Sequence, residues 1–385
     1  MMSSFILLAL LLITYGPLAL ARPSGNGEGG QAVDLSLLSD DLVFGLYAEL
    51  ARQRPGENLI FSPLGVSLAL LKLSRVCQAH ALTSSRVEIL AAFGLQNRTE
   101  VDGDAERTLG ALDSLVTDLV TEGKGEPQLS VQTFLQLNGN RLSLGQHVNQ
   151  SSGPGEGHTS SKPGQPKSGN TKLLFSKKST DKLILSNKVQ LTGRWRQPFD
   201  SRRTLGWRFH PNTTTSVEVA MMYRDDTAEQ KMLYDTNCST TVVQLQYSGR
   251  LSALLLLPRG VVRPLEECLS ITKMKFWLSN LKAGRAEIRV PKFALRKSYT
   301  LEKALKTSGI QGVFSQQSLQ LSQALHEVQL VMNESKAEDR GRSDTAIDLS
   351  EPHRIIFDRP FMLIVYDEIT EAIVLMGKIM DPTVK

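Results

Sequence analysis

Two apolar runs near the carboxyl end limit the folds open to this chain more than any other feature. Residues 361–366 and 372–376 are almost entirely apolar, and Asp-Glu-Ile-Thr-Glu joins them. A short apolar run bounded by polar turn residues is typical of a strand buried on both faces. The pair therefore predicts a buried β-hairpin, and 385 residues are enough to build a sizeable core around it.

The first third of the chain carries helical patterns. Apolar residues recur at helical spacing over residues 37–51, and Ser62-Pro63 supplies a cap and a first-turn proline for a helix over 63–73. That second segment is apolar on nearly all sides, which predicts burial. Residues 86–121 are predicted to be helical and acidic.

Strands are predicted mainly downstream. Residues 129–137 alternate at period two, and further strands are expected at 183–191, 217–222, 241–247, 251–257 and 286–290. Helices are expected near 264–282 and 300–308. No internal repeat is visible, so the pattern predicts a mixed α+β fold in one large domain over residues 36–385. Within it, 13 of the 20 residues 151–170 are Gly, Pro or Ser, which predicts a disordered surface loop.

The amino-terminal segment predicts secretion. An apolar run ends in Ala19-Leu20-Ala21, the small-x-small pattern of a signal peptide over residues 1–21, and residues 22–35 form a flexible leader. No later stretch approaches about 18 consecutive apolar residues, so we expect an extracellular chain without a membrane span. The sequence also offers five N-glycosylation sequons, at Asn97, Asn149, Asn212, Asn237 and Asn333.

The residue types that carry catalysis or bind metals are not arranged for either. Neither a zinc-ligand spacing nor a nucleophile elbow nor a phosphate-binding loop occurs, so we expect no enzyme, no metal and no cofactor. Cys77, Cys238 and Cys268 cannot all pair within one chain. Free or buried thiols are the preferred interpretation, and one bridge with one cysteine left over is the alternative.

The charge balance is mildly basic. Lys and Arg number 44 against 39 Asp and Glu, a net +5 that does not argue for a nucleic-acid or membrane partner. Basic residues do gather over Lys162–Lys182, where a polyanion such as heparin is a candidate partner. The alternative is a solvated lysine-rich loop.

Several motifs together resemble one family. Phe357-Asp-Arg-Pro-Phe361 and Leu375-Met-Gly-Lys-Ile-Met-Asp-Pro382 resemble the carboxy-terminal signature of the serpins. Further matches, in serpin order and at roughly serpin spacing, are Asn58–Pro63, Asn187, Gly193–Phe199, Met221-Met222, Val290–Phe293 and Leu321–His326. The resemblance covers nearly the whole chain from about residue 36, without resolving the subgroup.

The resemblance implies a secreted, monomeric inhibitor of serine proteases with three sheets and eight or nine helices. An exposed loop over residues 334–356 would serve as bait and, once cut, would insert as an extra strand in the large sheet. By similarity, Ser62, Asn187 and His326 lie where the family opens that sheet, and Trp195 lies near the point of loop entry. Counting back from Arg359-Pro360 puts the cleaved bond at Leu349-Ser350, which suits a chymotrypsin-like protease.

The hinge that must insert departs from the family pattern. After Glu334 the family carries small residues, whereas this chain has Ser335, Lys336, Ala337, Glu338, Asp339 and Arg340. Alternate side chains of an inserted strand face the core, and the loop is one residue short, so two registers are open. One turns Ala337, Asp339 and Gly341 inward and the other turns Lys336, Glu338 and Arg340 inward; both bury charge. A glycan on Asn333 would obstruct insertion further.

Other departures lie elsewhere in the chain. The Gly/Pro/Ser segment replaces the helix that crosses the front of the large sheet in the family, Gly65 replaces a serine in the sheet-opening cluster, and Thr370-Glu371 replaces a Thr-Gly turn. Two functions remain open. The chain is either a secreted serpin whose covalent trapping is weak or lost, or a non-inhibitory serpin that carries a small hormone or signals outside the cell.

Overall fold

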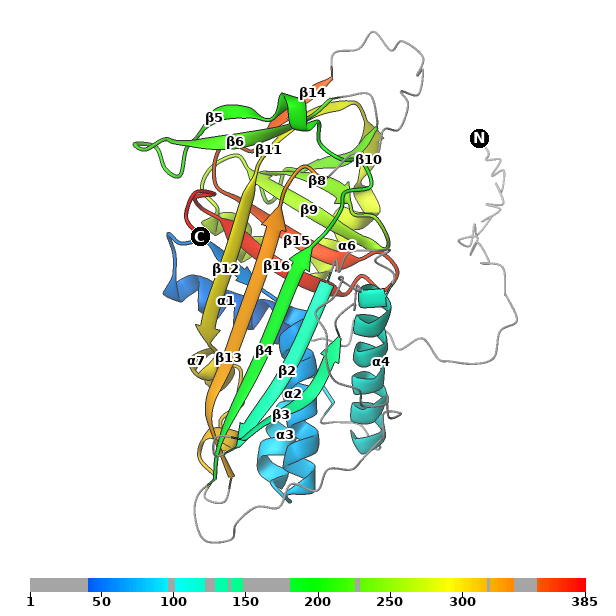
Figure 1. Cartoon of the computed structure of the whole chain (residues 1–385), viewed down its shortest axis with the longest axis vertical. Helices are drawn as coiled ribbons and strands as arrows, with labels where there is room; N and C mark the ends of the chain where they lie inside the picture. The colour runs from blue at the N-terminus through cyan, green and yellow to red at the C-terminus, as the bar shows by residue number, and fades with distance from the viewer. Residues whose placement is uncertain are drawn as a thin grey trace, which may run out of the picture. The chain divides into compact units, whose positions relative to one another are not determined.

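The computed structural model describes residues 41–95, 101–121, 129–137, 140–147, 181–225, 229–316, 319–335 and 352–385. Backbone proximity divides the chain into residues 1–32 and residues 33–385, and the following description concerns the second unit. The described strands form three sheets, and seven α-helices accompany them, in agreement with the α+β fold class that the sequence predicted (Figure 1). The predictions for residues 1–35 and 151–170 concern residues outside those described.

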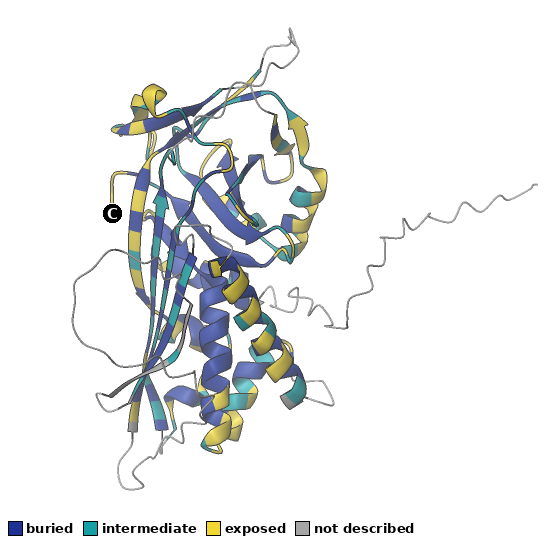
Figure 2. Ribbon diagram, turned by 45° about the vertical axis from the view of Figure 1, so that its right-hand side comes forward, coloured by how far each residue is buried: buried dark blue, intermediate teal, exposed yellow. Residues whose placement is uncertain are grey.

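The first sheet has five strands in the order β12-β13-β4-β2-β3. Their bounds are β12 Phe293–Thr300, β13 Leu319–Met332, β4 Asp181–Thr192, β2 Leu129–Leu137 and β3 Asn140–His147. Helices α2 (Pro63–Ala79), α3 (Thr83–Ala92) and α4 (Val101–Thr121) lie on one face of this sheet in both views (Figures 1 and 2). Helix α2 is buried over most of its length, as its apolar composition predicted.

The second sheet contains the predicted carboxy-terminal hairpin. Its order is β1-β16-β15-β9-β8-β7-β10. The bounds are β1 Leu59–Phe61, β16 Ile373–Ile379, β15 Phe361–Asp367, β9 Leu251–Pro258, β8 Thr240–Gln246, β7 Gln230–Asp235 and β10 Lys282–Gly284. Every residue of β9, β15 and β16 is buried, so the unbroken apolar runs do mark strands covered on both faces.

The third sheet lies at the top of the view in Figure 1 and has the order β14-β11-β6-β5. These strands are β14 His353–Ile356, β11 Ala286–Pro291, β6 Val217–Arg224 and β5 Leu205–Phe209. The last four residues of the expected bait loop therefore form a strand, parallel to β11. The remaining α-helices are α1 (Leu46–Gln53), α5 (Arg263–Cys268), α6 (Ile271–Asn280) and α7 (Glu302–Thr307), and short 3-10 turns span Ser201–Arg203 and Gly312–Phe314.

Several predicted helices have different limits. The segment expected to be helical from residue 37 is described from Asp41, as a π-helical turn over Asp41–Gly45 followed by α1. The acidic helix expected over 86–121 is two helices, because α3 ends at Ala92 and the chain turns at Gly94, which has φ +70°. There Gly94 N donates to Ala91 O and Leu95 N donates to Leu90 O, a glycine-terminated helix end.

The preferred interpretation of the cysteines is wrong. Cys238, after β7, and Cys268, at the end of α5, form a disulfide, and Cys77 alone is free and buried in α2. Their Cα atoms are 6.1 Å apart, within the range that a disulfide requires. Thirty residues separate the two cysteines, and nothing in their spacing identifies the pair.

Candidate functional site

Strands β13 and β4 meet at the centre of the five-stranded sheet. They pair in parallel from Leu319 opposite Asp181 to Val331 opposite Thr192, with one register shift between Leu321 and Gln323. A strand inserted between them would have to break this entire ladder first. Side chains that hold these two strands together would oppose such an insertion.

A buried hydrogen-bond cluster links the two strands to the start of α2. The backbone N–H of Ser62 donates to Nε2 of His326 at 3.1 Å, and Nδ1 of His326 lies 3.0 Å from Oδ1 of Asn187. Since Nε2 accepts, Nδ1 carries the proton and donates to Asn187. The amide nitrogen of Asn187 in turn donates to Thr133 Oγ1 on β2 at 3.2 Å.

The same cluster reaches the second sheet. Ser62 Oγ donates to the carbonyl of Val374 on β16 at 2.6 Å and also accepts from the backbone of Gly65. Ser62 and His326 have no exposed surface, and burial lowers the pKa of His326 to about 3, so its imidazole is neutral. Ser62, Asn187 and His326 thus form one connected group, whereas Trp195 lies elsewhere.

Gly65, which departs from the family pattern, lies against this cluster. A Cβ atom at this position would lie 2.5 Å from Val189 Cγ2 and 2.7 Å from Asn187 Oδ1. A serine would therefore require Asn187 to move away from His326. Because Gly65 has no side chain, Asn187 can stay within hydrogen-bond distance of His326.

Trp195 lies beyond the end of β4, at the base of the loop. Its ring stacks on Tyr247 with centroids 4.1 Å apart and an interplanar angle of 16°. Its Nε1 donates to the carbonyl of Asn333 at 2.9 Å, and its backbone N–H donates to Ser335 Oγ at 3.0 Å. Trp195 therefore holds the first residues after β13 in place.

Glu334 has a second set of bonds at the loop base. Its carbonyl accepts from the backbone N–H of Phe199, and its carboxylate accepts from Thr204 Oγ1 and pairs with Lys292 at 2.9 Å. Partial burial raises the pKa of Glu334, but the hydrogen bonds from Lys292 and Thr204 outweigh it, so the pKa falls below its ordinary value. The carboxylate is ionised at neutral pH and fixed by a cation.

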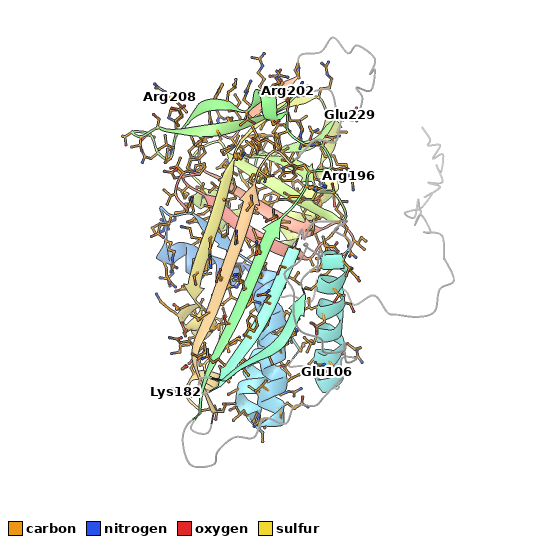
Figure 3. All side chains as sticks on the ribbon, in the orientation of Figure 1. Glu106, Lys182, Arg196, Arg202, Arg208 and Glu229 are labelled. Atoms are coloured by element: carbon orange, nitrogen blue, oxygen red, sulfur yellow. A yellow bond between two sulfur atoms is a disulfide. The ribbon has the colours of Figure 1, made fainter. Side chains whose placement is uncertain are left out.

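The other residues that the sequence predicted to be functional lie outside the described part of the chain or outside this site. Lys336–Arg340 of the hinge, Leu349 and Ser350 of the expected reactive bond, and the sequons at Asn97 and Asn149 lie outside the described residues. Asn212 and Asn237 are exposed and Asn333 is half-buried. Of the basic stretch Lys162–Lys182 only Lys182 is described, and it is exposed (Figure 3).

Sequence reasoning missed the residues that fix Glu334. Lys292 and Thr204 lie 42 and 130 residues from Glu334, and no local spacing connects them. Phe199 and Lys292 both belong to motifs of the family resemblance, but the sequence predicted no role for either of them. The fixed loop base becomes visible only once the three sheets are assembled.

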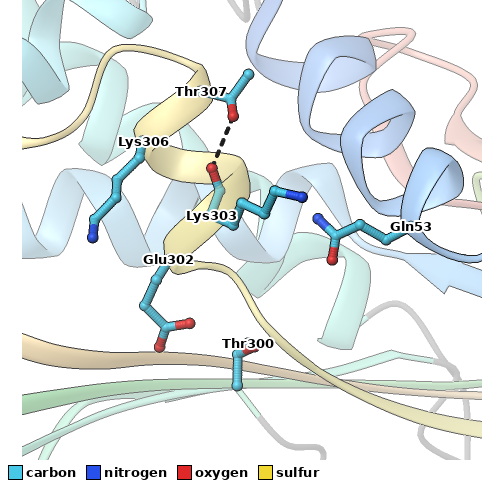
Figure 4. A pocket seen from close by; sticks show the side chains of 6 residues that line it. All are labelled: Gln53, Thr300, Glu302, Lys303, Lys306 and Thr307. Carbon is cyan, nitrogen blue, oxygen red and sulfur yellow. Dashed lines mark hydrogen bonds between the residues drawn. The ribbon is translucent and has the colours of Figure 1, made fainter.

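Two hollows in the described part of the chain differ in volume and in the polarity of their linings. An apolar space beside Asn187, between α2 and α7, has a volume of only about 10 Å³. A second hollow, of about 500 Å³, is lined by polar side chains (Figure 4). They are Gln53 of α1, Thr300 at the end of β12, and Glu302, Lys303, Lys306 and Thr307 of α7. In it Thr307 Oγ1 donates to the Lys303 carbonyl, and Lys303 also pairs with Glu49 at 3.4 Å. Neither offers an apolar cavity of hormone size.

Among the described residues, three or more His, Cys, Asp or Glu side chains never gather closely enough to hold a metal ion. None of the helices described has the length and apolar character needed to cross a membrane.

Three sheets, a buried cluster joining β4 to β13 and a fixed base for the following loop define the architecture of a serpin. A family model described as "Serpin (serine protease inhibitor)" matches residues 166–382. The chain belongs to the serpin family, as the sequence motifs indicated.

Known proteins resemble the chain over nearly its whole length. Kallistatin of Homo sapiens is 27% identical over 394 residues, which cover 93% of this chain and 90% of kallistatin. Thyroxine-binding globulin of Sus scrofa is 28% identical over 396 residues, with 91% and 90% covered. The solved structure of mouse protein-Z dependent protease inhibitor superposes with a TM-score of 0.68 at 22% identity, covering 91% of this chain and 98% of that one.

Proposed function

We propose that the protein is a secreted serpin whose loop over residues 334–356 is recognised and cut by an extracellular serine protease, but whose covalent trapping of that protease is weak or lost. Membership of the family and relatives named as protease inhibitors support the first half. The second half depends chiefly on one observation: the loop base is fixed at Glu334, and the charged sequence Lys336–Arg340 follows directly.

The energetics of insertion explain why these features weaken trapping. Insertion must separate β13 from β4 and release Glu334 from Lys292 and Thr204. It must then turn alternate hinge side chains into the core, and each unpaired charge costs several kcal/mol there. Such costs slow insertion while hydrolysis of the acyl bond to the protease continues.

The decisive experiment mixes the secreted protein with chymotrypsin, elastase or trypsin at near-equal molar amounts, followed by SDS gel electrophoresis and mass spectrometry. We expect cleavage at Leu349-Ser350 by chymotrypsin and little or no SDS-stable complex. The variant Leu349→Asp serves as the matched control and should lose that cleavage. A stoichiometric SDS-stable complex with any of the three proteases contradicts the proposal.

A non-inhibitory carrier is the second candidate. The charged hinge favours it, and relatives include a thyroxine-binding globulin. Equilibrium dialysis with thyroxine tests this alternative directly: saturable binding at one site per chain supports it, and no binding up to the solubility limit of thyroxine contradicts it for this ligand.

Secretion, glycosylation and polyanion binding complete the proposal. We expect cleavage after Ala21, glycans on sequons that include the exposed Asn212 and Asn237, and a monomer in solution. Heparin would bind through Lys162–Lys182 with strong salt dependence. Heparin affinity that survives replacement of these lysines by glutamine contradicts the last part.

A further inference from the structure

A polar cavity of about 160 Å³ lies beside the end of β6, away from the buried cluster and from the hollow of Figure 4. Its lining comes from the segment after Trp195, from β6, β7, β8 and β10, and from Glu229, which directly precedes β7. Three cationic side chains line it, Arg196, Arg224 and Lys231, against one carboxylate, that of Glu229. Figure 3 shows Arg196 and Glu229 on the same side of the molecule.

Arg224 is the unusual member, because it is buried with only 7% of its surface exposed. Its guanidinium donates to Gln230 Oε1 at 3.3 Å and to the Gln197 carbonyl, and it lies 4.4 Å from the centre of the Phe199 ring. Its Nε has no hydrogen-bond partner among the described residues. The acceptors that it does use are uncharged, so no carboxylate of a described residue neutralises it by a hydrogen bond.

Burial lowers the pKa of Arg224 to about 9, and the charge of nearby Asp225 opposes this shift. The guanidinium remains charged at pH 7. The Asp225 carboxylate lies 3.8 Å from Arg203. A buried cation that lacks an anionic hydrogen-bond partner is costly, and an anion in the cavity would remove that cost.

The rim adds charge that is also available to a ligand. Arg196 donates to Gln246 Oε1 at 3.1 Å and to the Gly249 carbonyl at 3.3 Å, both of them neutral acceptors. Lys231 is exposed. The lining therefore carries three positive charges and one negative charge, that of Glu229, which leaves a surplus of two positive charges.

Gln244 also lines this cavity. Its side chain is 8% exposed, and its Nε2 donates to the Tyr366 hydroxyl at 2.6 Å. Its Oε1 has no partner within the described part of the chain. A ligand that satisfies both Arg224 and Gln244 needs negatively charged oxygens and one hydroxyl, a combination that hydrogen phosphate has and sulfate lacks.

We propose that this cavity binds a small oxyanion that carries a hydroxyl group, with inorganic phosphate as the simplest member of the class. The anion would hold the Arg196–Phe199 segment against β6, β7 and β8. Because Phe199 also donates its N–H to the Glu334 carbonyl, occupancy would steady the base of the loop. The inference is independent of whether the loop traps a protease.

The test is calorimetric titration of the full-length secreted protein with sodium phosphate at pH 7, alongside sodium sulfate and sodium chloride at equal ionic strength. We expect one phosphate per chain, sulfate binding at least 5-fold weaker and no saturable response to chloride. Equal binding of phosphate and sulfate would overturn the role given to Gln244. Absence of saturable phosphate binding would overturn the site.

Variants separate the site from general surface charge. Arg196→Gln and Lys231→Gln should each weaken phosphate binding about 3- to 10-fold, and Glu229→Gln should strengthen it by a similar factor. Arg224→Gln should weaken binding about 30-fold or more. Arg208→Gln removes the same charge from the exposed part of β5, shown on the opposite side in Figure 3, and should change affinity less than 2-fold.

Because Arg224 is buried, its variant also requires a check of folding by circular dichroism. The exposed rim variants and Glu229→Gln keep the inference testable if Arg224→Gln does not fold. Affinities of Arg196→Gln, Lys231→Gln and Glu229→Gln that all equal that of the parent contradict the site. The same holds if Arg208→Gln weakens binding as much as the rim variants do.

Discussion

His326 occupies a core position of β13 that an apolar residue would normally fill. It is fully buried, and both ring nitrogens are hydrogen-bonded, to Ser62 N–H and to Asn187 Oδ1. Protonation would put a charge in the core and would leave Nε2 unable to accept from Ser62. The residue therefore links the pH of the solution to the stability of the sheet.

The pKa of His326 sets the direction of this link. It is about 3 in the folded chain and about 6.5 in the unfolded chain, so between pH 6.5 and pH 3 the unfolded state binds this proton and the folded state does not. The stability that His326 contributes is present above pH 6.5 and is lost as the pH falls toward 3. Between pH 7 and pH 5 we expect a loss of about 2 kcal/mol, measured by urea unfolding.

Two single substitutions test whether His326 causes this dependence of stability on pH. His326→Gln should remove most of the loss between pH 7 and pH 5, whereas His210→Gln, at an exposed position, should retain it. Burial also lowers the pKa of His80, so His80 adds to the loss of stability at low pH. For this reason the pH dependence of stability is compared between the two variants. An unchanged slope in His326→Gln would contradict the assignment.

Gly377 on β16 lies where β16 packs closely against the backbone of β1. A Cβ atom there would lie 2.2 Å from the Leu59 carbonyl oxygen and 3.0 Å from Ile60 Cα. Gly377→Ala must therefore push β1 away from β16, and we expect it to destabilise the chain by about 3 kcal/mol. The matched control is Gly110→Ala in α4, which meets no atom within 4 Å and should stabilise by about 0.5–1 kcal/mol. Thermal unfolding of both variants measures the contrast, and equal melting temperatures would refute it.

At the scale of elements, the disulfide joins the β7–β8 turn to helix α5. The following helix α6 is held to the same turn, since Trp277 Nε1 and Lys273 Nζ donate to Asp235 at 2.7 and 3.1 Å. Removing the bridge frees a 30-residue loop in the unfolded chain, which corresponds to about 3.6 kcal/mol. We expect Cys238→Ser with Cys268→Ser to lower stability by that amount; Cys238→Ser preserves the Asn237 sequon.

Thiol labelling and reduction complete this prediction. Without reductant the native parent should label at no cysteine, because Cys77 is buried and burial raises its pKa to about 12. After unfolding without reductant exactly one thiol should react. Dithiothreitol should lower the melting temperature of the parent but not that of the double variant, and the reverse would argue against the bridge.

Strand β13 shows why some elements were missed in the sequence. Its buried side chains fall at odd positions up to Leu321 and at even positions from Ala324, because the register shifts between Leu321 and Gln323. His326 then occupies one of the buried positions. A shift in period combined with a polar core residue hides the strand from a search for alternation. The hairpin β15–β16 also has a register shift, between Val365 and Tyr366, and it buries Asp367 and Lys378. It was predicted because its two unbroken apolar runs mark buried strands without any need for alternation.

The candidate site was only partly predictable for a related reason. The family motifs pointed to Ser62, Asn187 and His326, and the structure joins them by hydrogen bonds. The cavity around Arg224 and the fixed base at Glu334 bring together side chains from strands and connections that are distant in the sequence. Such sites form only when the sheets assemble. The spacing of apolar residues in one sequence predicts strands but does not predict which strands become neighbours.

At the scale of the whole molecule, the free energy of loop insertion separates a trapping serpin from one that is merely cut. The five-stranded sheet has β13 paired with β4, so a sixth strand has not entered between them. After cleavage of the loop, insertion would add a full ladder of hydrogen bonds, but both registers of this hinge bury charge. We expect the melting temperature of the parent to be unchanged by chymotrypsin cleavage of the loop.

Replacing the charged hinge should reverse that outcome. In the variant with Lys336→Ala, Glu338→Ala, Asp339→Ala and Arg340→Ala neither register buries a charge from these four positions, so cleavage should raise the melting temperature by about 10 °C. The uncleaved variant, which should melt within about 2 °C of the parent, is the control, and Asn333→Gln in both backgrounds tests the contribution of a glycan. If the cleaved parent gains as much stability as the cleaved variant, the hinge charges do not block insertion. Weak trapping would then have to come from the fixed base at Glu334, which Lys292→Ala would release.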